Sequence, residues 1–362
     1  MHMKLDHGAL VAAAKSIAGA VVRDSMSSWR HVRIDATENA ATLTACDGDI
    51  QIERRIGAVV DASGVILVPG RQFVAFANAL PVGLCEVVTS SPVRAKLMAG
   101  AATFAFEYKG VEDWPVFSGP GEKVAAAYLP AITFREMLRK ASWAMSKDPT
   151  RQNLRCVHMK LSAGKLLMVA TDGRALAQVE HEVESEDDAA VSLPEKLVGV
   201  LSSILGSEGD VRLAFDSRSI RVTAADWSVT SRAVDAVYPD WRRVIPANLP
   251  SSVTVARKEF VGEMERAALA APESGAIDIA FAGKTVDFAS QTETARYKSA
   301  IVPSRISGEP GEYTIDGRII KSALGCLDAD DVTIDYAPGG TSPIVLTSGI
   351  PWLAVIMPLR RL

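Results

Sequence analysis

The sequence predicts an α+β fold in which three tandem modules each combine two helices with a mostly antiparallel sheet. The first observation is a repeat of about 120 residues: "CDGD" returns as "TDGR", so that Asp47 and Asp172 lie 125 residues apart. The second is the same order of helical and strand-like stretches in each copy, which is typical of a repeated structural unit. The predicted domains span residues 1–122, 123–248 and 249–362.

Further matches support this period. The stretch "ILVPGRQFVAFANAL" returns as "VSLPEKLVGVLSSIL", which places Pro69 and Pro194 125 residues apart. A third copy, "YTIDGRIIKSALGCL", puts Asp316 122 residues beyond Pro194. In the same way "VEDWPVF" corresponds to "AVYPDWRRVIP", with 124 residues between Pro115 and Pro239. Four matches at nearly one spacing indicate duplication of a module.

The second copy shows how a module is built. "AITFREMLRKASWAMS" has apolar residues at helical spacing, which predicts a helix at the start of the module. "KLLMVA" and "ALAQVEHEV" then flank the DGR turn with strand-like content, and "LPEKLVGVLSSIL" predicts a second helix. The following stretches "DVRLAF", "SIRVTAA" and "WSVTSRAV" alternate apolar and polar residues. We therefore expect two helices and about six to eight strands in each module.

Asp172, in "VATDGRALA", has two interpretations. An Asp, a Gly and an Arg after an apolar run could form a catalytic loop. Asp-Gly between two alternating runs is also a strong hairpin signal, because Gly tolerates the positive φ that tight turns require. Catalysis would need a His, a Lys or a second carboxylate in reach, and the sequence marks none out. We therefore expect a hairpin and no catalytic residue.

The composition narrows the class of protein. Hydrophobic residues make up 48% and charged residues 23% of the 362 residues, as in ordinary globular proteins. No stretch has the length of a membrane span, and a secretion signal is missing, so we expect a cytoplasmic protein. The four Cys and five His residues are scattered, without the spacing of a metal site or a disulfide framework. We expect no metal and no cofactor.

Charge is divided between element types. The six predicted helices carry twelve basic and six acidic residues, a net charge of +6, whereas the whole chain carries −4. If these helices share one side of a curved assembly, that side would hold an anionic polymer such as DNA through phosphate contacts. The alternative is that Lys and Arg are simply good helix formers. No base-reading motif is present, so we expect contacts that do not depend on DNA sequence.

Three motifs resemble the bacterial sliding clamp family, the β subunits of the replicative DNA polymerase. They are "VATDGRALA" at 169–177, "YPDWRRVIP" at 238–246 and "AVIMPLRRL" at 354–362, and the threefold period agrees with them. The resemblance covers essentially the whole chain. It implies half of a closed ring: a head-to-tail homodimer that encircles duplex DNA, tethers the polymerase for processivity and is not an enzyme. It also implies a cleft between the second and third domains that docks peptides of polymerases and the clamp loader.

The resemblance also implies site residues. For DNA contact it implies Lys15, Arg23, Arg71, Arg139, Arg151, Gln152, Lys196 and Arg257. For the dimer interface it implies Phe104 and Phe106 facing Leu269 and Ala270, although the two Phe residues could equally be core of the first domain. For the peptide cleft it implies Leu154, Thr171, Gly173, Arg174, Leu176, Pro239, Arg243, Val244, Ser342, Pro343, Val355, Ile356, Met357, Pro358 and Leu359. The alternative for the apolar chain end is a core strand.

Some positions depart from the usual family pattern. Ala175 stands where Arg is common, Ile319 where Tyr is common, and Ser274 where a larger residue is frequent. These differences bear on the partner peptides rather than on the fold. A second functional hypothesis is therefore a clamp-like paralogue that binds peptides as an adaptor without encircling DNA. An enzyme, with Asp172 at its centre, is the third.

Overall fold

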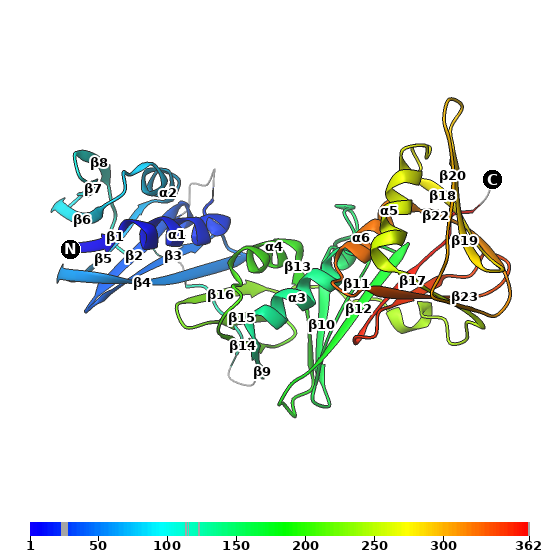
Figure 1. Ribbon diagram of the computed structural model, residues 1–362. Coiled ribbons are helices and arrows are strands. Elements are labelled where there is room, and N and C mark those ends of the chain that lie inside the picture. The colour runs from blue at the N-terminus through cyan, green and yellow to red at the C-terminus, as the bar shows by residue number, and fades with distance from the viewer. Residues whose placement is uncertain (23–27, 113, 115, 122–123, 361–362) are drawn as a thin grey trace. The chain divides into compact units, whose positions relative to one another are not determined.

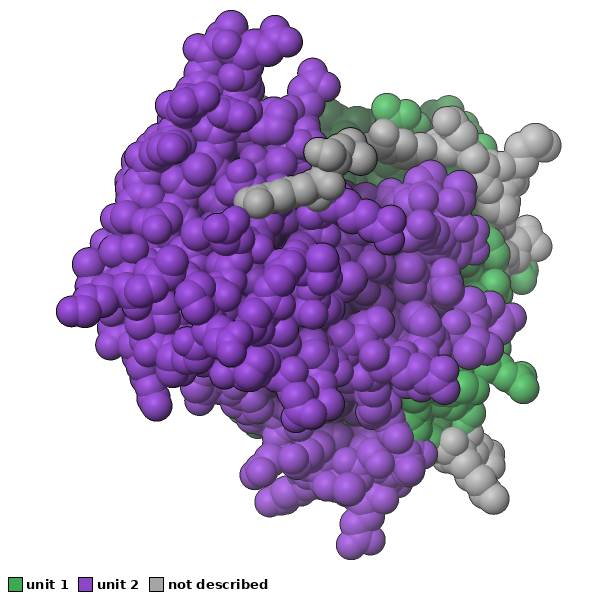
Figure 2. Space-filling view, turned by 90° about the vertical axis from the view of Figure 1, so that its right-hand side faces the viewer, with its two compact units in different colours: residues 1–134, 189–191, 199–233 green, residues 135–188, 192–198, 234–362 purple. Residues whose placement is uncertain are grey.

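The computed structural model describes residues 1–22, 28–112, 114, 116–121 and 124–360. The chain divides into two compact units, coloured separately in Figure 2. Unit 1 comprises residues 1–134, 189–191 and 199–233, and unit 2 comprises residues 135–188, 192–198 and 234–362. Each unit combines helices with antiparallel sheet, as the α+β prediction requires (Figure 1).

One large antiparallel sheet organises unit 1. Its strands run in the order β8-β7-β6-β1-β4-β16-β15-β14-β9, and β2, β3 and β5 join it through the pairing of β3 with β4. The long strand β4 pairs with β1 and β3 and also with β16 of the second predicted module. The strands are β1 (His2–Asp6), β2 (His31–Thr37), β3 (Ala40–Cys46), β4 (Ile50–Ala62), β5 (Gly64–Pro69), β6 (Leu84–Ser91), β7 (Arg94–Ala99), β8 (Ala102–Glu107), β9 (Ala125–Pro130), β14 (Asp210–Phe215), β15 (Ser219–Thr223) and β16 (Trp227–Arg232).

Unit 2 contains the second large sheet and a smaller one. The large sheet has the order β13-β10-β11-β12-β25-β24-β23-β17-β21, and the small one β20-β19-β18-β22. Residues 192–194 of β13 belong to this unit. The strands are β10 (Cys156–Ser162), β11 (Lys165–Thr171), β12 (Ala175–Glu182), β13 (Ala189–Pro194), β17 (Ser251–Ala256), β18 (Ala276–Ala282), β19 (Thr285–Gln291), β20 (Arg296–Ile301), β21 (Arg305–Ser307), β22 (Gly311–Asp316), β23 (Asp331–Tyr336), β24 (Ile344–Thr347) and β25 (Trp352–Ile356).

Each α-helix in the described part of the chain begins directly after a strand. The helices are α1 (His7–Ile17), α2 (Gly70–Ala79), α3 (Ala131–Ser142), α4 (Glu195–Ile204), α5 (Arg257–Ala268) and α6 (Gly317–Gly325). They follow β1, β5, β9, β13, β17 and β22 in turn, two to each predicted module. The predicted fold class is confirmed, while the exact domain limits at 122 and 248 stay a prediction. None of the described helices has the length and apolar character to cross a membrane.

The helices pack through the spacing that the sequence predicted. In α1 the buried residues are Leu10, Ala13, Ala14 and Ile17, which lie on one face of a helix with 3.6 residues per turn. In α5 the buried Phe260, Met264 and Ala267 form a similar face. Asp6 and Asp316 accept hydrogen bonds from the backbone N–H groups of Ala9 and Arg318, and so cap α1 and α6. All four cysteines are buried free thiols.

The repeated Asp-Gly pairs form hairpin turns. Asp172 Oδ1 accepts from the backbone N–H groups of Arg174 and Ala175, both at 2.8 Å, between β11 and β12. Gly173 has a φ of 88°, in the left-handed region that favours glycine. The first copy repeats this geometry, because Asp47 Oδ1 accepts from Asp49 and Ile50 at 3.0 Å. The hairpin interpretation of Asp172 is confirmed.

Candidate functional site

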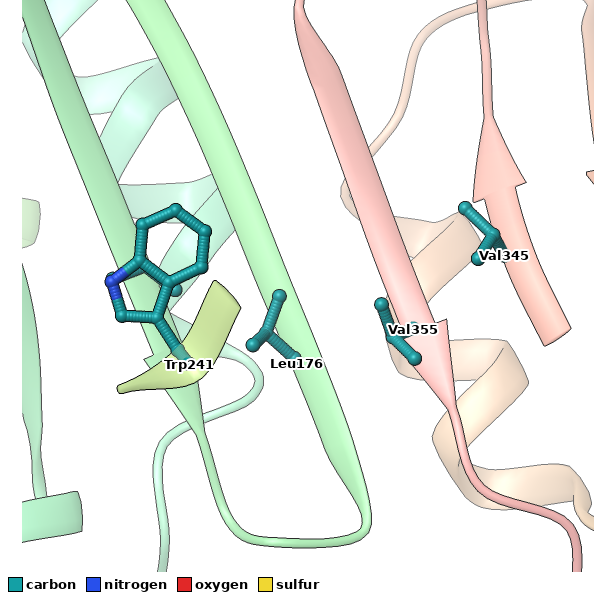
Figure 3. Close-up of a cluster of buried hydrophobic side chains, with 5 residues drawn as sticks. Leu176, Trp241, Val345 and Val355 are labelled. Carbon is teal, nitrogen blue, oxygen red and sulfur yellow. The ribbon is translucent and has the colours of Figure 1, made fainter. Parts of the chain in front are cut away.

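A buried apolar cluster in unit 2 includes two residues of the predicted peptide cleft, Leu176 and Val355, and is called the apolar floor below. Leu176 on β12 lies opposite Val355 on β25, and Val355 lies opposite Val345 on β24. These buried side chains form a cluster with Val169, and Trp241 from a short 3₁₀-helix (Trp241–Val244) packs against it (Figure 3). Segments that are far apart in sequence therefore build one buried apolar cluster. Ligand pockets are lined mainly by apolar side chains, so a cluster of this kind suits the base of a peptide groove.

Other predicted cleft residues are exposed and can act as walls. The side chain of Met357 is 40% exposed and that of Val244 is 48% exposed, while Pro239 and Arg243 are also exposed. Leu154, Ser342, Pro343, Pro358 and Leu359 are partly buried. Met357, Pro358 and Leu359 line a cavity of about 870 Å³ together with residues 310–312, 314, 339–341 and 360. The tail is held to the hairpin because the Met357 backbone N–H donates to Arg174 O at 2.8 Å.

Ile356 differs from the other predicted cleft residues of β25 in the face on which it lies. Its side chain is fully buried, and on β25 it follows Val355 directly. Because successive residues of a strand point to opposite faces, Ile356 lies on the face away from the cluster of Leu176 and Val355. Ile356 is as buried as Leu176 and Val355 but lies on the opposite face of β25 from them, so its assignment to the cleft stays a prediction.

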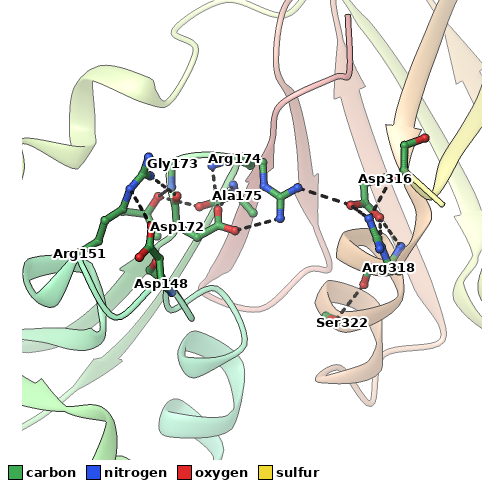
Figure 4. Close-up of polar contacts among 12 residues, drawn as sticks. Asp148, Arg151, Asp172, Gly173, Arg174, Ala175, Asp316, Arg318 and Ser322 are labelled. Carbon is green, nitrogen blue, oxygen red and sulfur yellow. Dashed lines mark hydrogen bonds and ion pairs between the residues drawn. The ribbon is translucent and has the colours of Figure 1, made fainter.

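A second cavity, of about 450 Å³, lies beside the hairpin turn. Its lining includes Asp172, Arg174, Arg151, Asp316 and Arg318. These side chains form a chain of opposite charges from the hairpin to the start of α6 (Figure 4). Sequence reasoning assigned Arg174 and Arg151 to different sites and missed both Asp316 and Arg318. A signal was available, because Asp-Gly-Arg occurs at 172–174 and again at 316–318.

Asp316 is the most buried member of this charged network, with 1% of its surface exposed. Its oxygens accept from Arg318 Nε and Nη2, each at 2.8 Å, and from the Arg318 backbone N–H at 3.0 Å. Arg174 Nη1 lies 3.6 Å from Asp316 Oδ2. Burial by itself raises the pKa of Asp316, but the hydrogen bonds from Arg318 and the charges of Arg318 and Arg174 outweigh it and hold the pKa below its usual value.

The loop before β10 carries two predicted DNA contacts. Arg151 is exposed; its Nη1 donates to Asp172 O at 3.2 Å and its Nε lies 3.7 Å from Asp148 Oδ2. Gln152 is exposed at the start of a 3₁₀-helix (Gln152–Leu154). Lys147 lies beyond the end of α3 and lines the 450 Å³ cavity.

The predicted DNA-binding cations on the helices differ in their exposure and in the ion pairs they form. Lys15, Arg71 and Lys196 are exposed on α1, α2 and α4. Arg139 on α3 pairs with Glu136 and, at 2.6 Å, with Asp328. Arg23 lies outside the described residues. The described helices together carry eleven basic and five acidic residues, a net charge of +6.

The guanidinium of Arg257 donates hydrogen bonds to backbone carbonyls inside unit 2. Its Nε donates to Ala329 O at 2.6 Å and its Nη1 to Leu324 O at 3.2 Å, in the last turn of α6. A guanidinium that satisfies carbonyls at a helix C-terminus stabilises that helix end. The structure therefore gives Arg257 a role in holding the end of α6, which the sequence did not indicate.

The predicted interface residues lie on two elements. Phe104 and Phe106 are partly buried on one face of β8, the last strand of the sheet order, and the Phe104 ring stacks on Phe76 of α2 at 4.3 Å. They therefore contact the first module and still reach its surface. Leu269, directly after α5, is 87% exposed, whereas Ala270 is buried. Of the latter pair, only Leu269 offers its side chain to a partner.

Comparison with known proteins identifies the class of this fold. The structure matches a DNA polymerase sliding clamp from Bacillus subtilis with a TM-score of 0.93 at 22% identity, over all of both chains. A sliding clamp from Pseudomonas aeruginosa bound to griselimycin also gives 0.93 at 22% identity, again over all of both chains. The fold is thus that of a DNA sliding clamp.

The sequence comparisons agree with the fold. Residues 1–118 and 128–240 match the family models of the DNA polymerase III beta subunit, N-terminal and central domains. The beta sliding clamp of Synechocystis sp. is 26% identical over 90% of each chain. That of Synechococcus elongatus is 29% identical over 86% of this chain and 85% of the relative. The chain belongs to the family of bacterial DNA polymerase III beta subunits, the beta sliding clamps.

Proposed function

We propose that two copies of this chain close head to tail into a ring around duplex DNA, and that the ring tethers the replicative polymerase to its template. Each copy contributes three domains, residues 1–122, 123–248 and 249–362. Two unlike ends that pair twice under a twofold axis close such a ring without leaving an open end. Because bacterial DNA lies in the cytoplasm, the protein works there.

The charge of the helices carries this proposal. They hold a net charge of +6 on a chain whose total is −4. A cationic surface attracts the phosphate backbone without reading bases, so the protein can slide along DNA of any sequence. We assign these contacts to Lys15, Arg71 and Lys196, which are exposed on their helices, and to Arg151 and Gln152. Arg139 and Arg257 contribute less, because their guanidinium groups already bind groups of unit 2.

The interface of the ring is assigned to Phe104 and Phe106 of one copy and Leu269 of the other. The two Phe rings reach the surface on an edge strand, and Leu269 is an exposed apolar side chain. An edge strand presents unpaired backbone groups that a second chain can cover. Apolar side chains beside such an edge favour association.

Partner docking is assigned to the apolar floor around Leu176 and Val355 and to the walls formed by Met357, Pro358 and Val244. Peptides of the polymerase and of the clamp loader would lie on this floor. Met is a suitable wall residue because its flexible thioether adapts to different ligands. Griselimycin, which a relative binds in its crystal structure, is a first small probe for this cleft.

Retention on circular DNA tests the ring. The protein is loaded on nicked circular duplex with the clamp loader of the same organism and then washed at a salt concentration that removes contact-only binders. We expect retention on the circle and loss after one cut linearises it, since a ring leaves only over an end. Equal loss from both forms contradicts the proposal. If the mass in solution is also that of one 38.6 kDa chain, the adaptor hypothesis is favoured.

The proposed mechanism needs no bond-making residue, and Asp172 tests this. Its carboxylate accepts two backbone hydrogen bonds in the hairpin. The variant Asp172→Asn keeps an oxygen acceptor at that point and removes the charge. We expect retention on circular DNA to stay unchanged, as measured by the same assay. Loss of retention in a variant that is folded by circular dichroism would give Asp172 a role beyond the turn.

A further inference from the structure

Arg174 lies between two carboxylates at the edge of the cleft. Its Nη2 is 3.7 Å from Asp172 Oδ2 and its Nη1 is 3.6 Å from Asp316 Oδ2. Both distances are too long for hydrogen bonds, so these ion pairs orient the guanidinium without consuming its N–H donors. The side chain is 59% exposed and lines the 450 Å³ cavity. Figure 4 shows it between the two carboxylates.

The two carboxylates differ in how firmly they are held. Asp172 belongs to the same hairpin as Arg174, whereas Asp316 comes from the end of β22. Asp316 also caps α6, and both of its carboxylate oxygens accept hydrogen bonds from the guanidinium of Arg318. Gly275, with a φ of 75°, packs against it so closely that a Cβ there would meet Asp316 Oδ1 at 2.7 Å. Asp316 is therefore a fixed charge in the wall of the cavity.

Arg174 is also tied to the proposed cleft through its backbone. Its carbonyl oxygen accepts from the N–H of Met357, which forms a wall of the cleft. Leu176, part of the apolar floor, follows two residues later on β12. A peptide on this floor would pass the guanidinium of Arg174. An Arg that is already oriented loses less side-chain entropy when it donates to a ligand.

We propose that Asp316 is a positioning residue for peptide docking: it fixes the guanidinium of Arg174 at the edge of the cleft, where Arg174 donates to oxygens of the docked peptide. This inference rests on the proposed docking function. Asp316 itself is buried and does not touch the ligand; it acts through Arg174.

The test is a double-mutant cycle on peptide affinity. The probe is the tightest binder from an overlapping set of peptides that spans the replicative polymerase of the same organism, titrated by fluorescence anisotropy. The variants are Asp316→Asn, Arg174→Gln and the two combined. Asn is as good a helix N-cap as Asp, so the cap of α6 is kept while the charge is removed. The matched control is Asp148→Asn, in the same cavity but paired with Arg151.

We expect Asp316→Asn to weaken binding about fivefold, the scale of one side chain losing its preorganisation. In the Arg174→Gln background the same change should have no further effect, and Asp148→Asn should leave the affinity unchanged. A merely structural role would weaken binding equally in both backgrounds, and that result overturns the inference. Unchanged affinity of Asp316→Asn also overturns it.

Two further outcomes are separable. If Asp316→Asn does not fold, Asp316→Ser replaces it, because Ser also caps a helix and lacks the charge; the same cycle then decides. If no polymerase peptide binds the unaltered protein, the proposed docking function fails, and the role of Asp316 in docking fails with it. If the peptide binds but the cycle is additive, docking stands and only the positioning role is wrong.

Discussion

The imidazole ring of His158 stacks on the phenol ring of Tyr238, with ring centroids 4.7 Å apart and planes 11° from parallel. His158 Nδ1 also lies 3.1 Å from Ser192 Oγ. Burial, followed by the nearby charges of Arg242 and Lys160, lowers the pKa of His158 to about 4. Tyr238 packs against the apolar floor of the cleft, so this stack supports the proposed docking surface from its side.

The first prediction concerns pH. The His158 pKa is lower in the folded than in the unfolded chain, where it is near 6.5, so only the unfolded chain takes up a proton between these values. The contribution of His158 to the free energy of unfolding is therefore fully present above pH 6.5. It is lost progressively as the pH falls towards 4, by up to about 3 kcal/mol. Urea unfolding at several pH values should show this fall in the unaltered protein. The variant His158→Asn should lack that part of the pH dependence, and an identical fall in both would refute the assignment.

The second prediction separates the floor of the cleft from its walls. Leu176→Ala removes a buried side chain from the packed cluster and should lower the free energy of unfolding by about 2–5 kcal/mol. Met357→Ala, at a half-exposed position, should lower it by less than about 1 kcal/mol while weakening peptide binding. Urea titration and fluorescence anisotropy measure the two effects. A large stability loss for Met357→Ala would place this residue in the core.

The third prediction concerns the interface. Leu269→Arg places a charge on an exposed side chain and should leave the fold intact while preventing dimer formation. Light scattering should then give the mass of one 38.6 kDa chain, where the unaltered protein gives twice that mass. Val116→Arg, at another exposed apolar position, is the control and should remain a dimer. A dimeric Leu269→Arg variant would remove Leu269 from the interface.

The fourth prediction concerns the salt dependence of DNA binding, and it compares exposed helix cations with Arg257, whose guanidinium binds backbone carbonyls. Combining Lys15→Ala with Arg71→Ala should reduce the slope of log affinity against log salt on short linear duplex by about 2, since each phosphate contact contributes about 0.9. Arg257→Ala should leave the slope nearly unchanged, well short of the change of about 0.9 that the loss of one phosphate contact would cause. It should instead destabilise the protein by about 1–3 kcal/mol, because two carbonyls lose their donor. A slope change of about 0.9 for Arg257→Ala would instead show that Arg257 contacts DNA.

Local chemistry made much of the fold predictable. The Asp-Gly turns are encoded within a few residues, because Asp47 and Asp172 each hold their own hairpin through one side-chain oxygen. The helices are encoded by apolar residues at the spacing of one helical face, as in α1. The turn signal and the helix signal each depend only on residues that are close in sequence. Both recur in successive modules, which supports the prediction.

The site was less predictable because it depends on strand register and on where long side chains point. Val355 and Ile356 are adjacent apolar residues, and only the register of β25 decides which of them faces the cluster. Arg257 has the residue type of a phosphate contact, but its guanidinium turns to the end of α6. The repeated Asp-Gly-Arg marks both segments, but the pairing of Arg174 with Asp316 joins distant parts of the chain, so the repeat alone could not reveal that they meet.

The direct pairing of β12 with β25 has a kinetic consequence. Five consecutive residue pairs, from Ala175 with Ile356 to Val179 with Trp352, connect the two strands as neighbours in one sheet. A hinge at this seam would have to break that ladder of backbone hydrogen bonds, so the surface above it does not wait for a slow opening motion. If partners dock above this pairing as proposed, we expect their association rate to be set by diffusion and orientation.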